Sequence, residues 1–388
     1  MGIQKIRTAQ SCAADAAQAV QEFHAAVTQP DMALVVFFCS SEYDLDVLAA
    51  EMRRLFAGIQ VVGCTTAGEI GPAGYRQHSL SGASFPVGSF TAVSGLLDRL
   101  SQFDIASGHV FAQSLLQRLE GKVPQAGPDN SFALLLIDGL SMREDLATHA
   151  LQKALGKIGL FGGSAGDDLK FAKTHVYCDG SFHSDSAVLT LISTTLPFRI
   201  FKTQHFVATD KRLVITEADP ATRTIREING LPAAEEYARM VGVDVQDLGP
   251  MHFAISPLVV TMGGTDYVRA IQKANPDGSL TFFCAIEEGL VLRVAHGVDM
   301  VNNLEQAFAN IRAEIGLPQL VIGCECILRN LEVSQHNLEE RVGEIFRRNN
   351  AIGFASYGEQ FHDVHVSQTL TGIAIGTGAD SVREPHDD

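Results

Sequence analysis

Three short segments of the chain combine a hydroxyl side chain, a glycine and a carboxylate in that order. They are residues 65–69 (TTAGE), 164–167 (SAGD) and 356–359 (SYGE), and each follows an apolar run. Glycine permits a tight turn and the close approach of another group, and a turn after a strand can present backbone N–H groups to a ligand. The three turns are therefore candidates for one shared binding site. The alternative is that the glycines only allow the chain to leave each strand.

The turns match no known phosphate-binding motif. The sequence contains no GxxxxGK[ST] loop, no clean GxGxxG and no HExxH pair. No nucleophile and base can be paired from the sequence. An enzyme that uses the glycine turns to hold a phosphate or acyl group is therefore the weakest interpretation, and we expect the protein not to be an enzyme.

Histidine and arginine side chains in apolar surroundings are the other candidates. His365 follows the third turn, His205 lies in a strand-like run flanked by aromatic residues, and His252 precedes a phenylalanine. A structural role remains open for each of them. Arg269 and Arg329 are expected within apolar strands, where a buried guanidinium needs a partner. An anionic ligand, a turn acid or a structural salt bridge would each serve.

Each turn is preceded by a predicted strand, helix and strand. The strands are apolar runs rich in β-branched and aromatic residues, and the helices repeat apolar residues at helical spacing. The predicted strands are 34–39, 59–64, 132–137, 158–163, 320–324 and 351–355, and the helices are 43–56, 144–155 and 338–348. The pattern predicts an α/β (mixed α+β) protein with two domains of layered sheets and helices, built on repeated strand–helix–strand units.

Other segments carry local signals of their own. Residues 79–97 alternate and contain glycine and proline, which predicts a β-hairpin. Asn229-Gly230 is a strong turn pair, and Pro232 stands where proline favours the start of a helix over 233–241.

The amino-acid composition argues against some classes of binding partner. The 388-residue chain has a formal net charge of −16, which argues against nucleic acid and anionic membranes. No apolar run approaches the roughly 20 residues of a membrane span, and the first residues lack the apolar core of a signal peptide. The seven cysteines form no CxxC motif. We expect a cytoplasmic protein, and self-association into a homo-oligomer is compatible with the sequence.

Several separated motifs together resemble one family. They are residues 63–69, 162–167, 229–233, 353–360 and 365–372. In this order they are similar to the FIST sensory domain, in its N- and C-terminal halves. The resemblance implies a FIST N-terminal domain over 28–225 and a FIST C-terminal domain over 226–376, followed by a disordered tail over 377–388.

The resemblance also implies a function. FIST domains are regarded as small-molecule sensors in signal transduction, and this chain looks most like the bacterial NosP type. That type binds haem b non-covalently, senses nitric oxide and modulates a partner histidine kinase in two-component and cyclic-di-GMP signalling linked to biofilm behaviour. The alternative is a FIST sensor of another small molecule, such as an amino acid, without haem.

Haem requires an axial ligand, an apolar slot and cations for its propionates. If the resemblance holds, His365 is the first candidate for the iron ligand, followed by His205 and His252. Arg269 and Arg329 are candidate propionate partners.

The third turn would then contribute to the mouth of the haem pocket. Tyr357 and Glu359 are the candidate residues there, and Glu69 and Asp167 would hold similar places in the other two turns.

Overall fold

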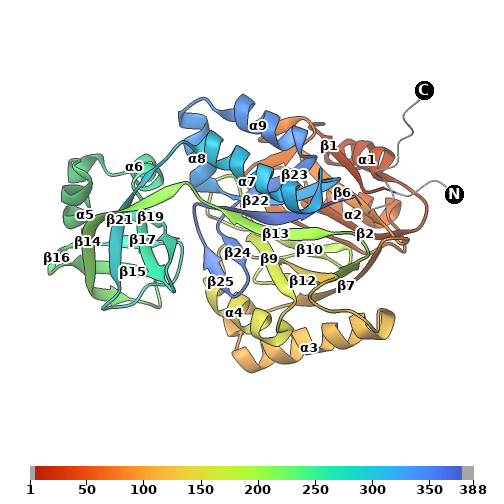
Figure 1. The fold of residues 1–388 in the computed structure, drawn as a ribbon, viewed down its shortest axis with the longest axis horizontal. Coiled ribbons are helices and arrows are strands. Elements are labelled where there is room, and N and C mark those ends of the chain that lie inside the picture. The colour runs from red at the N-terminus through yellow and green to blue at the C-terminus, as the bar shows by residue number, and fades with distance from the viewer. Residues whose placement is uncertain (1–4, 378–388) are drawn as a thin grey trace.

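The computed structural model describes residues 5–377. They form a body (residues 5–205 and 298–377) and a small lobe (residues 206–297), which lies at the left of Figure 1. The predicted mixed α/β class with two domains is confirmed. The limits 28–225 and 226–376 remain predictions, and the predicted tail, 377–388, lies outside the described residues except for Thr377.

The body is built on three six-stranded sheets. The first has the order β1 (Arg7–Ser11), β6 (Leu80–Pro86), β2 (Met32–Ser40), β3 (Val61–Thr66), β10 (Val176–Cys178), β11 (Ser181–His183). The second has the order β25 (Val364–Val366), β24 (Glu359–Phe361), β9 (Gly159–Ser164), β8 (Ser131–Ile137), β12 (Ala187–Thr194), β7 (Phe90–Leu97). The third has the order β13 (Phe198–Thr203), β26 (Leu370–Ile375), β22 (Leu320–Cys326), β23 (Ala351–Ser356), β4 (Glu69–Gly71), β5 (Gly74–Arg76).

The three sheets exchange hairpins in a cycle. Each strand–helix–strand unit has a parallel strand pair, and the hairpin that follows its turn joins another unit's sheet. Hairpin β4–β5 pairs with β23, β10–β11 pairs with β3, and β24–β25 pairs with β9. The exchange ties the three units together and brings their turns to one place.

Helices cover the outer faces of the sheets, and the apolar core lies between the sheets. The helices of the body are α1 (Ala16–Val27), α2 (Leu45–Leu55), α3 (Ile105–Lys122), α4 (Glu144–Leu155), α7 (Met300–Ile315), α8 (Ile327–Gln335) and α9 (Glu339–Arg348). In α1, α2, α3 and α7 an aspartate side chain accepts the first free N–H groups. In the core, Phe38 of the first sheet stacks on Phe354 of the third at 4.6 Å.

The small lobe consists of one twisted sheet and two helices, inserted between β13 and α7 (Figure 1). Its elements are β14 (Phe206–Asp219), β15 (Thr224–Ile228), β16 (Leu231–Pro232), α5 (Ala233–Val241), α6 (Pro250–Ile255), β17 (Leu258–Met262), β18 (Thr265–Arg269), β19 (Ile271–Ala274), β20 (Leu280–Phe282) and β21 (Val291–Gly297). The predicted turn at Asn229-Gly230 joins β15 to β16, with φ of 55° and 75°. The predicted helix over 233–241 is confirmed as α5.

Three local predictions were wrong. Residues 79–97 do not form a hairpin, because β6 pairs with β1 and β2 while β7 pairs with β12 in another sheet. Arg329 lies on α8, because the chain leaves β22 at Cys326 and continues directly into a helix. His205 lies in the connection between β13 and β14 and not within a strand.

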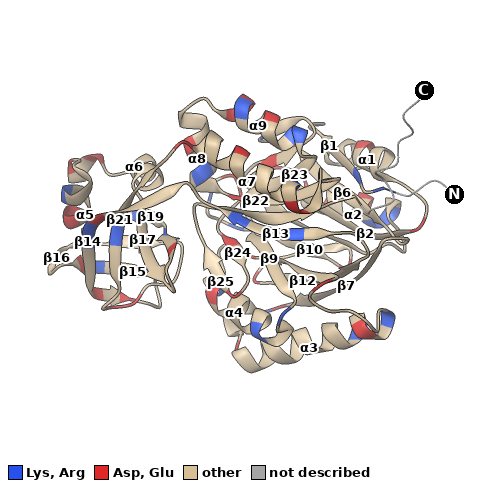
Figure 2. Ribbon diagram, viewed as in Figure 1, with Lys and Arg blue, Asp and Glu red and all other residues tan. Residues whose placement is uncertain are grey.

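Two features of the structure concern possible partners: the distribution of charged residues and the length of the helices. In Figure 2 acidic and basic residues are interspersed along α9 and over the other helices of the body. None of the helices in residues 5–377 combines the length and apolar character that crossing a bilayer would require.

Candidate functional site

The three predicted turns meet in a ring of direct backbone hydrogen bonds. We call residues 65–69, 164–168 and 355–359 the turn ring. The first and third turns are joined by Ala67 N–H to the Ala355 carbonyl (3.0 Å), the second and third by Ser164 N–H to the Gly358 carbonyl (2.8 Å), and the first and second by Gly166 N–H to the Thr65 carbonyl (3.0 Å). The prediction that the turns converge is confirmed.

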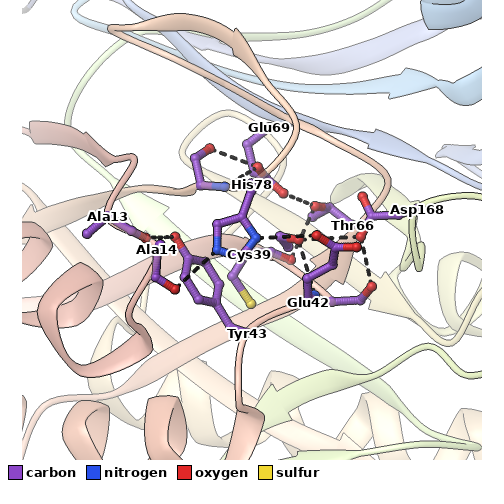
Figure 3. A network of polar contacts seen from close by, with 12 residues as sticks. Ala13, Ala14, Cys39, Glu42, Tyr43, Thr66, Glu69, His78 and Asp168 are labelled. Carbon is purple, nitrogen blue, oxygen red and sulfur yellow. Dashed lines mark hydrogen bonds and ion pairs between the residues drawn. The ribbon is translucent and has the colours of Figure 1, made fainter.

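Two of the turns have the same carboxylate arrangement. Glu69 accepts hydrogen bonds from the hydroxyl of Thr66, three residues earlier, and from the N–H (3.0 Å) and hydroxyl (2.8 Å) of Ser79, ten residues later. Figure 3 shows Glu69 and Thr66 in this network. Glu69 is fully buried, and burial raises the pKa of its carboxyl well above the ordinary value.

Glu359 repeats this arrangement in the third turn. It accepts from the hydroxyl of Ser356 (2.6 Å), again three residues earlier, and from the hydroxyl (2.7 Å) and N–H (3.3 Å) of Thr369, ten residues later. Burial raises the pKa of Glu359 to about 8. Its side chain is therefore enclosed by Ser356 and Thr369 and does not line the mouth of a pocket.

The second turn differs from the other two. Asp167 accepts the N–H groups of Phe171 (2.9 Å), Ala172 (2.7 Å) and Lys173 (2.9 Å), and it also accepts the hydroxyl of Tyr357. The loop that it organises reaches the small lobe, because Phe171 stacks on Tyr357 at 4.7 Å and lies 6.0 Å from the ring of Phe283.

The turn ring lies against the small lobe along an interface that we call the seam. It consists of residues 265–270 and 283–285 of the small lobe and residues 355–369 of the body, with β18 beside β25. An ion pair closes it at one side, where Arg223 of the small lobe bonds Glu144 (2.7 Å) and Asp145 (3.0 Å) at the start of α4.

His365 lies in the seam on β25 and is 2% exposed. Burial lowers its pKa to about 4, so the imidazole is neutral at physiological pH. The side-chain amide of Gln360 donates to Nδ1 at 3.3 Å, and Nε2 is buried with no partner among residues 5–377. The ring packs against Gly358, whose φ is 134°, and a Cβ at that position would lie only 2.7 Å from Nε2.

Arg269, at the end of β18, lies in the same seam. Only 9% of the residue is exposed, and its Nε and Nη1 have no hydrogen-bond partner in the described part of the chain. The charge of Arg269 contributes to the lowered pKa of His365, after the larger effect of burial. The structure thus brings together His365 and Arg269, which the sequence analysis had singled out separately.

His205 and Arg329 form a different cluster. Arg329 is completely buried and bonds Nδ1 of His205 at 3.0 Å and Glu325 at 3.1 Å, while Nε2 of His205 bonds Glu332 at 2.9 Å. Arg329 therefore already has a counter-ion in Glu325. His205 also stands where the chain enters the small lobe, and its carbonyl accepts the N–H of Val298, where the chain returns (2.7 Å).

His252 is half-buried on α6 in the small lobe. Its carbonyl accepts the hydroxyl of Tyr237 at 3.2 Å, and its Nδ1 is buried without a partner. No hydrogen bond found in residues 5–377 links His252, His205 or Arg329 to His365 or Arg269.

Sequence reasoning missed several residues of the seam. Gln360 directly follows the third turn acid, so its position next to the motif was a usable signal. Arg223 and its partners Glu144 and Asp145 carried no signal, because they are almost 80 residues apart and meet only through the fold.

The donor groups of the seam do not match what haem requires. A histidine that binds a metal through Nε2 usually donates its other N–H to an acceptor, whereas Nδ1 of His365 accepts from Gln360 and Nε2 faces Gly358. Five cavities in residues 5–377, of 240 to 710 Å³, are lined by neither His365 nor Arg269. Separately, the same residues contain no group of three or more His, Cys, Asp and Glu side chains that could hold a bare metal ion. The seam does not accommodate haem in this arrangement.

Comparison with solved structures found matches that extend over nearly the whole chain. One is the cyanuric acid hydrolase from A. caulinodans, with 8% identity and a TM-score of 0.40, and another is a cyanuric acid hydrolase described as an evolutionary innovation by structural concatenation, with 10% identity and a TM-score of 0.35. Each match covers 96% of this chain and 99% of the other. Among curated proteins, no sequence matched this chain.

One expectation is corrected by these matches. We expected the protein not to be an enzyme, but both matched proteins are hydrolases, so that expectation no longer stands. At TM-scores of 0.40 and 0.35 the likeness assigns no activity to this chain.

Family comparison agrees with the motifs of the turn ring. The FIST N domain matches residues 33–231, which is more than half of the chain, and the FIST C domain matches residues 233–362. The chain therefore belongs to the FIST family, whose domains are sensory domains of signalling proteins.

Proposed function

We propose that this protein senses a small molecule that binds in the seam between the body and the small lobe. The observation that carries the proposal is a set of buried polar atoms of seam residues that have no partner within residues 5–377. They are Nε2 of His365, Nε and Nη1 of Arg269, Oγ of Ser367, and the Oε1 atoms of Gln360 and Gln368. Buried polar atoms in native proteins are nearly always paired, so such a group marks a site for a polar ligand or for water that a ligand displaces.

Movement of the small lobe would carry the signal. The lobe is connected to the body by two crossings, held together by the bond from Val298 N–H to the His205 carbonyl. The ion pairs of Arg223 with Glu144 and Asp145 hold the small lobe against the body. A ligand that binds the closed and open arrangements with different affinity shifts the balance between them.

The resemblance to the NosP type supplies a candidate ligand and a candidate partner for this proposal. Haem b with nitric oxide is one candidate ligand, and its entry would require the lobes to separate around His365. A smaller polar molecule is the candidate that the closed seam favours. A partner histidine kinase is the proposed output, because signalling proteins pass their state to an effector, and the net charge of −16 argues against nucleic acid in that role.

Absorption spectra of the full chain after incubation with ferrous haem, with and without nitric oxide, separate the two candidates. The variants are His365→Ala and, as a control, His24→Ala, which changes a histidine of α1 outside the seam. A Soret band that shifts with nitric oxide and is lost only in His365→Ala would establish haem at this site. Without specific uptake, a thermal-shift screen of small polar molecules follows. Binding of a ligand that is unaffected by substitution of either His365 or Arg269 would overturn the seam as the sensory site.

A further inference from the structure

Arg269 is a buried cation without a counter-ion. Within residues 5–377 its guanidinium makes no hydrogen bond and no ion pair, and Nε and Nη1 are closed off from solvent. A guanidinium remains protonated at any ordinary pH. A buried charge without a partner carries a large desolvation cost, so its retention here calls for an anion that binds it.

The carboxyl groups near Arg269 already have other hydrogen-bond partners. Glu144 and Asp145 both bond Arg223, at 2.7 and 3.0 Å, and Asp145 also accepts the N–H of Ala285 at 3.2 Å. Glu359 is enclosed by Ser356 and Thr369 of its own turn region. The seam therefore holds one positive charge that no side chain within residues 5–377 neutralises.

Neutral groups that could hold the rest of a ligand lie in the same seam. Because Gln360 donates to Nδ1 of His365, the proton of that neutral ring is on Nε2, which has no acceptor. Oγ of Ser367 and Oε1 of Gln368 are buried and unpartnered. The amide of Gln368 bonds the carbonyls of Phe253 and Ala254 in α6, so this segment spans the two lobes.

We infer that the seam binds the carboxylate of a small organic acid, with Arg269 as its bidentate partner and the Nε2–H of His365 as a further donor. The inference rests on the proposed function, which places the ligand in the seam. A planar guanidinium matches a carboxylate through two parallel N–H···O bonds. The single uncompensated positive charge of Arg269 matches the single negative charge of a carboxylate. Ser367 and Gln368 would accept from a hydroxyl or ammonium group on the ligand.

Thermal unfolding of the full chain tests the inference. The probes are sodium acetate, sodium lactate and glycine, with sodium chloride and sodium sulfate at matched ionic strength as references. We expect the carboxylates to raise the Tm of the wild type by at least about 2 °C at saturation, because a ligand that binds only the folded state stabilises it. Arg269→Met should lose this response. Without ligand its Tm should be at or above the wild-type value, because an unpaired buried charge is removed.

The controls separate a specific site from a general effect. Arg226→Met changes an exposed arginine of the same lobe, paired with Glu217, and should respond as the wild type does. Arg269→Lys keeps the positive charge but loses the two parallel N–H donors of the guanidinium, so its Tm should respond only weakly to carboxylates. This variant also provides a test if Arg269→Met does not fold.

Three results would overturn the inference. They are an equal response to chloride, a response to sulfate alone, or an undiminished carboxylate response in both Arg269 variants. If a ligand of another class binds in a manner that depends on His365 but not on Arg269, the inference fails and the proposed function stands. If no ligand of any class depends on His365 or Arg269, both fail.

Discussion

The first and third turns of the ring are nearly identical, whereas the second differs from both. Gly68 and Gly358 have φ of 127° and 134°, a conformation that favours glycine, while Gly166 has no positive φ. Glu69 and Glu359 are enclosed by hydroxyl groups of their own units. Asp167 instead holds a loop that leads to the small lobe.

This difference separates a structural part of the ring from a functional part. A buried carboxyl that bonds only groups of its own strand–helix–strand unit and the hairpin that follows it fixes the exit of a strand, and this arrangement occurs twice. The second turn gives up that arrangement and contacts Tyr357 of the third turn, and Phe171 of its loop reaches Phe283 of the small lobe. The candidate site lies where the repeat of the three units is broken.

Removing the enclosed carboxyls should have the largest effect. We expect Glu69→Ala and Glu359→Ala each to lower the free energy of unfolding by roughly 3 kcal/mol or more, because each leaves several buried donors without a partner. Asp167→Ala should cost about 1 to 2 kcal/mol, because Phe171, Ala172 and Lys173 are exposed and water can bond the released N–H groups. Urea unfolding of the three variants measures the difference. A cost for Asp167→Ala equal to the others would remove the distinction.

The pH dependence of stability sharpens the same contrast. The pKa of Glu359 is raised from 4.5 to about 8 in the folded protein, so between these values the folded state holds a proton that the unfolded state has released. This contribution is complete below pH 4.5 and is lost as pH rises toward 8. The stability of the wild type relative to Glu359→Gln should therefore fall by a few kcal/mol over that range. Parallel pH profiles of the two proteins in urea unfolding would contradict the assignment.

Tyr357→Phe tests the link between the second and third turns. The variant keeps the ring that stacks on Phe171 and loses the hydroxyl that bonds Asp167 and accepts Leu169 N–H at 2.8 Å. We expect a loss of roughly 1 to 2 kcal/mol and faster proteolysis within residues 167–173. Tyr43→Phe, which removes a hydroxyl bonded to Ala13 outside the ring, is the matched control and should leave that cleavage rate unchanged.

The smallest effect is expected at the outer edge of the second turn. The hydroxyl of Ser41 bonds Asp168 at 2.8 Å in a half-buried position. Ser41→Ala should lower the free energy of unfolding by less than about 1 kcal/mol, because solvent can replace the bond. A loss as large as that of Glu359→Ala would show that the second turn is as tightly enclosed as the other two.

Local sequence patterns predicted the helices and strands of this fold. They did not predict contacts between residues that are far apart in the sequence. The helices over 144–155 and 233–241 and the turn at Asn229-Gly230 follow from neighbouring residues, and they were predicted with their observed limits. The alternation of residues 79–97 revealed strands without their partners, because pairing depends on how whole units meet.

The candidate site shows the same division. His365 and Arg269 were singled out by residue type and apolar surroundings, but their shared location and the missing partner of Arg269 depend on the packing of β18 beside β25. Arg329 looked equivalent in sequence, yet Glu325, four residues earlier, became its neighbour only once the chain entered α8.

Hydrogen exchange of the full chain, with and without saturating sodium acetate, would test the central claim most directly. The account predicts slower exchange in residues 167–173, 265–270 and 364–369, which line or approach the seam, with little change in α1 and α2. Arg269→Met should abolish this protection. Protection confined to other segments, or the same protection in Arg269→Met, would contradict a ligand site between the turn ring and the small lobe.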